Sequence, residues 1–310
     1  MTLTPTSPMV HPLDQNSELV DLIAEVSGEP RGVVIQRLMD EEECLGTNVR
    51  RDLKEAGVPS HVWSDAMIEF YRTTRSFLYE TVAWNRAPLK LEMRTWIGNF
   101  LAERASGRSL KVFSFGDGLG FDSVYLAKAG HDVTYFEVSE ECVHFAKKVF
   151  AKNGQDVTVI RSEQEILEGE FDVIICLDVL EHVPSPPECI EMFSRILRPG
   201  GWLLTHSPFF FTSSHRVTHL ASNRKYSGST EMFTQQGLHP VDGRFFWDPI
   251  ALEKSSTEPT QRRLGPMRAG GRLLKIGRVA NAIHCYLAQK MSKTDRRWRD
   301  ELKLLLKVET

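Results

Sequence analysis

The sequence predicts an α/β fold in which a mostly parallel sheet carries helices on both faces. Three observations support this prediction. An apolar strand, residues 110–115, runs into a glycine-rich turn and a helix, and a second strand, residues 132–138, ends near the carboxylate of Glu137. An apolar run, residues 173–177, is typical of a strand that is buried on both faces. Strands that alternate with helices in this way form parallel sheets.

Three glycines stand at alternate positions in the turn after the first strand: Gly116, Gly118 and Gly120. Glycine lets the backbone turn tightly and approach a ligand, and the helix that follows, residues 121–130, presents free N–H groups at its start. A dinucleotide fingerprint has the spacing G-x-G-x-x-G, which rests a pyrophosphate on the helix N-terminus. The G-x-G-x-G spacing of this chain favours a nucleoside ligand without phosphates, with Glu137 binding its ribose hydroxyls.

The remaining strands are predicted in order along the chain. Residues 156–160 form a third strand, and the apolar run forms a fourth that ends in the motif Asp178-Val179-Leu180-Glu181-His182-Val183. A helix over residues 186–197 then leads through Leu197-Arg198-Pro199-Gly200-Gly201 into a fifth strand.

With these motifs the chain resembles the class I S-adenosylmethionine-dependent methyltransferases, over residues 105–255. In that family a hydrophobic strand runs into G-x-G-x-G. The motif D-x-L-E-H-V is frequent after strand four, and L-(K/R)-P-G-G leads into strand five. The resemblance implies a Rossmann-like seven-stranded methyltransferase sheet with helices on both faces. It also implies S-adenosylmethionine as cofactor, S-adenosylhomocysteine as product, and methyl transfer to an O, N or S atom of a small-molecule acceptor, such as an amino-acid-like compound or a phenol.

The resemblance further implies which residues bind the cofactor. The glycines accommodate its close approach, Glu137 binds its ribose, and the chain around Leu177 borders its methionine end. In the family a polar residue after strand three, often Asp, usually contacts the adenine amino group. This chain has Ser162 and Glu163 at that place. Ser114 stands where an Asp is frequent, so Asp117 is expected to contact the methionine amino group instead. The complete expected set is Phe115, Gly116, Asp117, Gly118, Gly120, Glu137, Val138, Ser162, Glu163, Leu177 and Asp178.

Catalysis depends on the acceptor, because a hydroxyl or ammonium group needs a base and a thioether or neutral amine does not. The candidate bases are His182, His206, His215 and His219. The alternative for His182 is a packing role in a loop that methyltransferases of many chemistries share. Tyr71 is expected to line the site, because an aromatic face stabilises a sulfonium cation. The expected catalytic set is His182, Asp178, His206, His215 and Tyr71.

A divalent cation is a further possibility in the loop after strand four. In the quinone-precursor O-methyltransferases a similar acidic loop is associated with such a cation, and Asp178, Glu181 and His182 match its positions, with Asp where that group has Glu. Oxygen-rich ligation would suit magnesium. His215 and His219 would share one face of a helix at metal-ligand spacing, although a polar wall of the acceptor pocket is the favoured interpretation.

Arginines provide candidates for binding an acceptor carboxylate, as an amino-acid-like acceptor would require. Arg75, Arg216 and Arg224 are the candidates, and the alternative for each is an ordinary position on the surface.

Helices are also predicted in the segments that precede and follow the sheet region in the sequence. The expected division is a disordered N-terminus over residues 1–16, a helical cap over 17–107, the S-adenosylmethionine-binding domain over 108–255 and a basic helical extension over 256–310. Ser17 is a plausible N-cap of the first helix. The aromatic-rich segment 60–84 is expected to supply core residues and part of the acceptor pocket.

The C-terminal section is basic, with thirteen Lys and Arg against four Asp and Glu over residues 261–310. Two helices are predicted there, over residues 271–291 and 295–306. A cationic helix face is usually a solvated surface, and the alternatives are contact with RNA, with anionic lipid or with the acidic body of a second subunit.

Net charge, cysteine spacing and the length of apolar runs limit the classes of protein to which the chain can belong. The chain of 310 residues has a formal net charge of -3 and five cysteines without a C-x-x-C pair, so we expect neither a disulfide framework nor a thiolate zinc site. No apolar run approaches the length of a membrane span, and the start lacks the pattern of a secretory signal. We therefore expect a cytoplasmic homodimer that does not bind nucleic acid.

Two other functions remain open at this point. One is methylation of RNA or another macromolecule through the basic C-terminal helices, although the (D/N)-P-P-(Y/F) motif of base-modifying enzymes is replaced by Asp178-Val179-Leu180. The other is a non-catalytic protein that binds S-adenosylmethionine.

Overall fold

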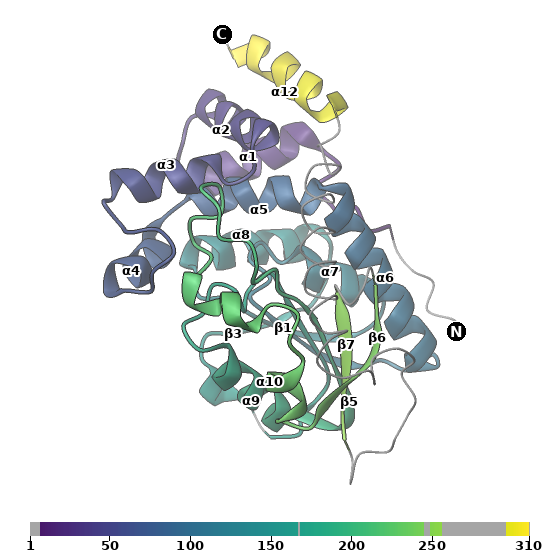
Figure 1. The fold of residues 1–310 in the computed structure, drawn as a ribbon. Coiled ribbons are helices and arrows are strands. Elements are labelled where there is room, and N and C mark those ends of the chain that lie inside the picture. The colour runs from purple at the N-terminus through teal and green to yellow at the C-terminus, as the bar shows by residue number, and fades with distance from the viewer. Residues whose placement is uncertain (1–6, 167, 245–248, 256–295, 310) are drawn as a thin grey trace.

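A seven-stranded sheet forms the centre of the computed structural model, which describes residues 7–166, 168–244, 249–255 and 296–309 (Figure 1). The strand order is β3-β2-β1-β4-β5-β7-β6. Strands β1 to β5 are parallel, while β7 pairs antiparallel with both β5 and β6. The strands are β1 (Lys111–Phe115), β2 (Asp132–Phe136), β3 (Thr158–Ile160), β4 (Phe171–Leu177), β5 (Leu197–His206), β6 (Leu238–Gly243) and β7 (Ile250–Lys254). The predicted fold class is confirmed.

Both faces of the sheet are covered, because successive strand residues point to opposite sides. Val112 and Val173 belong to a core shared with α7 (Phe121–Lys128) and α8 (Glu140–Lys152). The next residues on the same strands, including Phe113 and Ile174, join a second core with α9 (Pro186–Ile196) and α10 (Glu231–Thr234). This double burial explains why β4 reads as a continuous apolar run.

Six helices precede the sheet in the described chain and supply one wall of the site. They are α1 (Asn16–Ser27), α2 (Arg31–Glu43), α3 (Thr47–Glu55), α4 (Asp65–Thr73), α5 (Ser76–Arg86) and α6 (Pro88–Ala105). Ser17 does not cap α1, because the N-cap position is occupied by Gln15. Within the aromatic segment, Ser64 caps α4 by accepting a hydrogen bond from the Met67 N–H, and the extended backbone of Thr74 separates α4 from α5.

The expected disorder of residues 1–16 is wrong for residues 7–16. Val10 and Leu13 are buried in the main core, since the segment packs against the cap and the sheet domain. Its backbone is also held by side chains from both parts: the Pro8 carbonyl accepts from Arg94 at 2.7 Å, and the His11 carbonyl accepts from Asn153 at 2.8 Å. Residues 1–6 lie outside the described residues.

The C-terminal helix α12 (Arg296–Glu309) packs against α1 and α2 at the top of the view in Figure 1. This confirms a helix where residues 295–306 were predicted helical, and the helix extends to Glu309. Trp298 is 1% exposed, and the Arg86 guanidinium lies 4.6 Å from its ring centroid. Arg299 forms ion pairs with Glu42 and Glu43 on α2, so part of the positive charge of the C-terminal section is neutralised by the chain's own carboxylates. The helix predicted over residues 271–291 lies outside the described residues.

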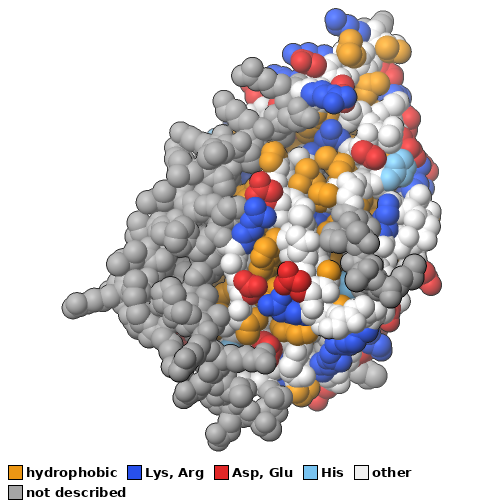
Figure 2. All heavy atoms as spheres, turned by 90° about the vertical axis from the view of Figure 1, so that its right-hand side faces the viewer, with side chains coloured by type: hydrophobic (Ala, Val, Ile, Leu, Met, Phe, Trp, Pro, Cys, Tyr) orange, Lys and Arg blue, Asp and Glu red, His pale blue; other side chains and the backbone are white. Residues whose placement is uncertain are grey.

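Figure 2 shows a face on which acidic and basic side chains of the described residues are interspersed with hydrophobic ones. Among the helices that the structure describes, none combines the length and the apolar character needed to cross a membrane.

Candidate functional site

A cavity of about 460 Å³ opens where the parallel strands end, between the sheet and helices α4, α5 and α6. Open α/β sheets bind ligands at this edge, because the loops after adjacent strands converge there. One part of the wall comes from the glycine turn and the ends of β1, β2 and β4. The other part is rich in aromatic side chains of the cap and of the loop after β5.

The three glycines of the turn have different tasks. Gly116 and Gly118 line the cavity, both with positive φ, and a Cβ on Gly116 would lie 2.5 Å from Cγ2 of Val179. Gly120 is not among the lining residues. A Cβ there would lie 2.6 Å from Phe150 on α8, at a φ of +78°. This glycine allows the turn to pack against α8, and a contact of Gly120 with the cofactor stays a prediction.

Glu137 connects the end of β2 to the glycine turn. Its carboxylate accepts hydrogen bonds from the backbone N–H groups of Gly118 at 3.0 Å, Val138 at 2.8 Å and Ser139 at 3.0 Å. Burial raises the pKa of Glu137, and the three backbone bonds oppose that rise. The side chain lies on the cavity wall, as the predicted ribose contact requires.

Asp117 serves the start of α7. Its carboxylate accepts from the N–H groups of Asp122 at 3.2 Å and Ser123 at 2.7 Å. Burial and the nearby charge of Asp122 raise the pKa of Asp117 to about 7. The residue also lines the cavity, so contact with a methionine amino group remains a prediction.

The other expected cofactor residues divide into two groups. Phe115, Val138 and Leu177 line the cavity. Ser162 does not, and its N–H donates to Glu165 at 2.8 Å within the turn after β3. The backbone of Glu163 begins that turn, and its side chain lies outside what the structure describes.

Asp178 is a centre of polar contacts on the cavity wall. Its carboxylate accepts from the indole N–H of Trp84 at 2.8 Å and bonds Nδ1 of His206 at 2.6 Å, and Nζ of Lys90 lies 3.7 Å away. Burial works to raise the pKa of Asp178, but these three groups together hold it below its usual range. Asp178 adopts a φ of 60°, which is rare for a residue other than glycine and occurs at functional sites.

Lys90 was missed by sequence reasoning. It lies at the start of α6, is buried on the cavity wall, and pairs with Asp122 at 2.8 Å. A lysine in a helical pattern carries no signal of such burial, since most helical lysines are solvated.

Aromatic rings from the cap form the opposite wall of the cavity. Trp63, Tyr71 and Phe77 follow one another, with ring centroids 6.2 Å apart for the first pair and 5.0 Å apart for the stacked second pair. Tyr71 lines the cavity, and its role in catalysis stays a prediction. Its hydroxyl lies 3.0 Å from Nδ1 of His182, which is also 3.2 Å from the Thr218 carbonyl.

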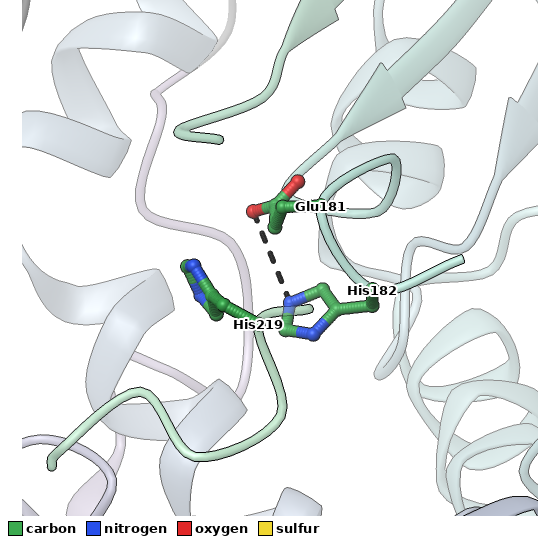
Figure 3. Close-up of side chains that lie close together, drawn as sticks. All are labelled: Glu181, His182 and His219. Atoms are coloured by element: carbon green, nitrogen blue, oxygen red, sulfur yellow. Dashed lines mark ion pairs between the residues drawn. The ribbon is translucent and has the colours of Figure 1, made fainter. Parts of the chain in front are cut away.

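Glu181, His182 and His219 converge on one point (Figure 3). One ligand atom from each lies within 4.8 Å of the others, and Oε1 of Glu181 is 3.8 Å from Nε2 of His182. Burial lowers the pKa of His182 to about 4 and that of His219 well below its usual value, so both rings are neutral at pH 7. Asp178 is not part of this cluster, and His219 from the loop after β5 takes the third place instead.

His215 lies outside the cavity lining. Its Nδ1 is 3.3 Å from the Cys44 thiol and 3.1 Å from the Arg50 guanidinium. The expected shared helix face of His215 and His219 is wrong, because residues 207–220 form a loop that orients the two rings independently. The geometry therefore gives no support to His215 as the base.

One ion pair interrupts the aromatic wall. Nη1 of Arg216 lies 3.0 Å from Oε1 of Glu80, and both residues line the cavity. Burial raises the pKa of Glu80 to about 7, and the charge of nearby Glu41 adds to the effect while Arg216 opposes it. Of the three arginines that were candidates for a carboxylate, Arg75 pairs with Glu141 at 3.9 Å and Arg224 is exposed, and neither lines the cavity.

Comparison with known proteins gives a consistent result. A family model described as a methyltransferase domain matches residues 86–241. Ubiquinone biosynthesis O-methyltransferases of Pseudomonas aeruginosa and Bordetella avium are 36% and 32% identical over 107 and 133 residues. These matches cover 33% and 42% of this chain and 46% and 50% of the relatives, so the chain spans about half the length of the curated relatives it matches.

A similarity to a solved structure is also found. The magnesium protoporphyrin IX methyltransferase of Synechocystis, solved with bound S-adenosylmethionine, is 22% identical with a TM-score of 0.40, covering 52% of this chain and 77% of that chain.

Proposed function

The chain belongs to the class I S-adenosylmethionine-dependent methyltransferases, and we propose that it transfers the cofactor's methyl group to an O, N or S atom of a small-molecule acceptor. One observation carries this proposal: a single cavity joins the glycine turn and Glu137 to an aromatic compartment that contains buried histidines. The proposed nucleoside-binding end and acceptor-binding end thus share one cavity.

The residues on the wall fit the cofactor. Gly116 and Gly118 provide a backbone surface without side chains, and Glu137 provides a carboxylate for the ribose hydroxyls. Lys90 provides a buried cation near Asp117 and Asp178, where the zwitterionic methionine end would lie. The cofactor supplies an electrophilic methyl group on a sulfonium when bound.

Methyl transfer is an in-line displacement, so the protein must hold the acceptor atom, the methyl carbon and the sulfur in line. Such positioning lowers the barrier by roughly 7–11 kcal/mol in well-oriented systems. The rings of Tyr71 and Phe77 provide a flat surface for a planar acceptor. His206, oriented by Asp178, is placed to accept an acceptor proton. His182, held by the Thr218 carbonyl, could do so only when its Nε2 holds no metal ion.

A divalent cation would suit the cluster of Glu181, His182 and His219. Nδ1 of His219 is buried without a hydrogen-bond partner, and a neutral imidazole is the form that binds a metal. Two nitrogens and one carboxylate favour zinc, manganese or iron over the magnesium that an oxygen-rich set would prefer. Such an ion would lower the pKa of an acceptor hydroxyl.

We further propose that the acceptor is a phenol or an amino-acid-like compound and that the enzyme acts as a cytoplasmic homodimer without nucleic acid. The names of the curated relatives support an oxygen acceptor. The division into a cap over 17–107, a cofactor domain over 108–255 and a C-terminal extension likewise remains a proposal.

Release of S-adenosylhomocysteine tests the function directly. The full chain is incubated with S-adenosylmethionine, a phenol or small amino-acid panel, and either zinc, manganese or a chelator. Acceptor-dependent product formation is expected, with a marked loss in His182→Ala. Cofactor binding without product formation from either acceptor class would favour the non-catalytic alternative.

A further inference from the structure

Two arginines, Arg72 and Arg216, line the end of the cavity near the aromatic wall, and Arg216 is the less exposed of the two. Arg216 is only 13% exposed and makes one hydrogen bond, from Nη1 to Glu80. A guanidinium carries five N–H donors in a planar fork, so four of them have no partner among the residues that the structure describes. Because Arg216 lies on the cavity wall, these donors are open to an acceptor group of a bound ligand.

The backbone around Arg216 is held in place by the cap. The His61 N–H donates to the Val217 carbonyl at 2.8 Å, and the Ala221 N–H donates to the His61 carbonyl at 3.0 Å. His61 Nδ1 also lies 2.9 Å from the His219 carbonyl. The loop after β5 is therefore fixed on both sides of His219, which orients Arg216 toward the cavity before any ligand binds.

Glu80 only partly neutralises Arg216. Burial and the Glu41 carboxyl raise the pKa of Glu80 to about 7, so a fraction of this side chain is protonated near neutral pH. Arg216 lines the same cavity as His182 and His219 and stands three residues before His219 in the chain.

We propose that the acceptor is an aromatic compound that carries a carboxylate, and that Arg216 binds this carboxylate while the aromatic wall binds the ring. The inference rests on the proposed function and names its substrate class. Tyr71 and Phe77 supply stacking surfaces, and the Arg216 fork matches a carboxylate in two parallel hydrogen bonds. The hydroxyl to be methylated then lies on the same ring, toward His182 and His219.

The cofactor's own carboxylate is a competing partner for Arg216. The structure favours Lys90 for that group. Lys90 pairs with Asp122, whose backbone N–H donates to Asp117 of the glycine turn. Arg216 lies among the residues proposed to bind the acceptor. Substituting Arg216 separates the two cases, because cofactor affinity and acceptor affinity are measured independently.

Calorimetric titration of the full chain, saturated with S-adenosylhomocysteine, provides the test. The probes are 3,4-dihydroxybenzoate and catechol, which differ only in the carboxylate. The native protein is expected to bind the benzoate at least about tenfold more tightly, the scale of a charged hydrogen bond. Arg216→Gln is expected to abolish this preference and Arg216→Lys to keep part of it.

Two further variants separate binding from a purely structural role. Glu80→Gln frees Arg216 from its counter-charge, so it is expected to tighten benzoate binding and leave catechol binding unchanged. Arg224→Gln removes an exposed arginine of the short helical segment that follows this loop, Ala221–Tyr226, and is expected to keep the native preference. Equal binding of both probes by the native protein, or a preference that survives Arg216→Gln, would overturn the proposal, as would a loss of S-adenosylhomocysteine affinity alone. Failure of the native protein to bind S-adenosylhomocysteine would instead count against the proposed function.

Discussion

The carboxylate of Asp178 and the imidazole of His206 join the ends of two neighbouring parallel strands, with Oδ1 and Nδ1 2.6 Å apart. The backbone makes a second link, because the Asp178 N–H donates to the His206 carbonyl at 2.8 Å. This pairing accounts for the left-handed φ of 60° at Asp178, which turns the side chain back toward β5. Both residues line the cavity.

Asp178→Asn is expected to leave the protein folded and to lower turnover by at least about tenfold. The amide keeps the shape of the side chain but removes the charge that holds His206 and balances Lys90. Steady-state kinetics on the full chain measure the effect, and Asp156→Asn, at an exposed site, serves as the control. Native turnover in Asp178→Asn would exclude a role for the pair in catalysis.

Gly120→Ala is expected to destabilise the fold more than Gly154→Ala, although both glycines have positive φ. The left-handed backbone costs about 1–2 kcal/mol at either position. At Gly120 the new Cβ also meets Phe150 at 2.6 Å, whereas nothing lies within 4 Å at Gly154, so about 1–3 kcal/mol more is expected from overpacking. Urea unfolding of the two variants gives the difference, and equal losses would contradict the packing role of Gly120.

The free energy of unfolding is expected to fall as the pH drops below about 6.5, the ordinary pKa of histidine, partly because of His131. Burial lowers the pKa of this ring, which is 7% exposed and accepts from the Leu110 N–H at 3.4 Å, although Asp172 opposes the shift. The unfolded chain therefore binds a proton on His131 at a higher pH than the native state does, and acid favours unfolding. His131→Gln keeps an acceptor and should show a smaller loss between pH 7.5 and pH 5.5. An unchanged pH dependence would refute this assignment.

Trp298→Ala is expected to cost about 3–5 kcal/mol of stability while leaving cofactor affinity unchanged. Its ring is buried between α12 and the cap, under the Arg86 guanidinium. Leu304→Ala on the same helix is the control, since Leu304 is 62% exposed. Urea unfolding of both variants is monitored by far-UV circular dichroism, which reports the backbone and does not depend on the removed tryptophan. Equal stability of Trp298→Ala and the native chain would mean that α12 does not contribute to the fold.

Much of the sheet could be predicted because the signals are local. The run over 171–177 is apolar at every strand position except Asp172, and the glycine turn and Glu137 mark the ends of β1 and β2 in the sequence itself. The seven-stranded sheet was expected from the resemblance to a family whose motifs occur in the same sequence order. The two antiparallel strands β6 and β7 were expected only from that resemblance, since neither has a distinctive pattern.

The acceptor end could be predicted only in part, because its residues come from segments that are distant in sequence. His219 joins Glu181 and His182 from the loop after β5, and Arg216 meets Glu80 across 136 residues. Lys90 reads as an ordinary helical lysine until the fold buries it beside Asp122. Gly120 looked like its two neighbours in the motif, and only the position of α8 reveals its different task.

Calorimetric titration with S-adenosylmethionine tests the central claim most directly, comparing the native chain with Glu137→Ala and with Glu140→Ala at an exposed site nearby. The account predicts micromolar binding by the native protein and by Glu140→Ala, and binding weakened at least about tenfold in Glu137→Ala, since a charged hydrogen bond to the ribose is lost. Circular dichroism confirms that each variant is folded. Absence of binding to the folded native chain, or equal affinity in all three proteins, would contradict the assignment of this cavity as the cofactor site.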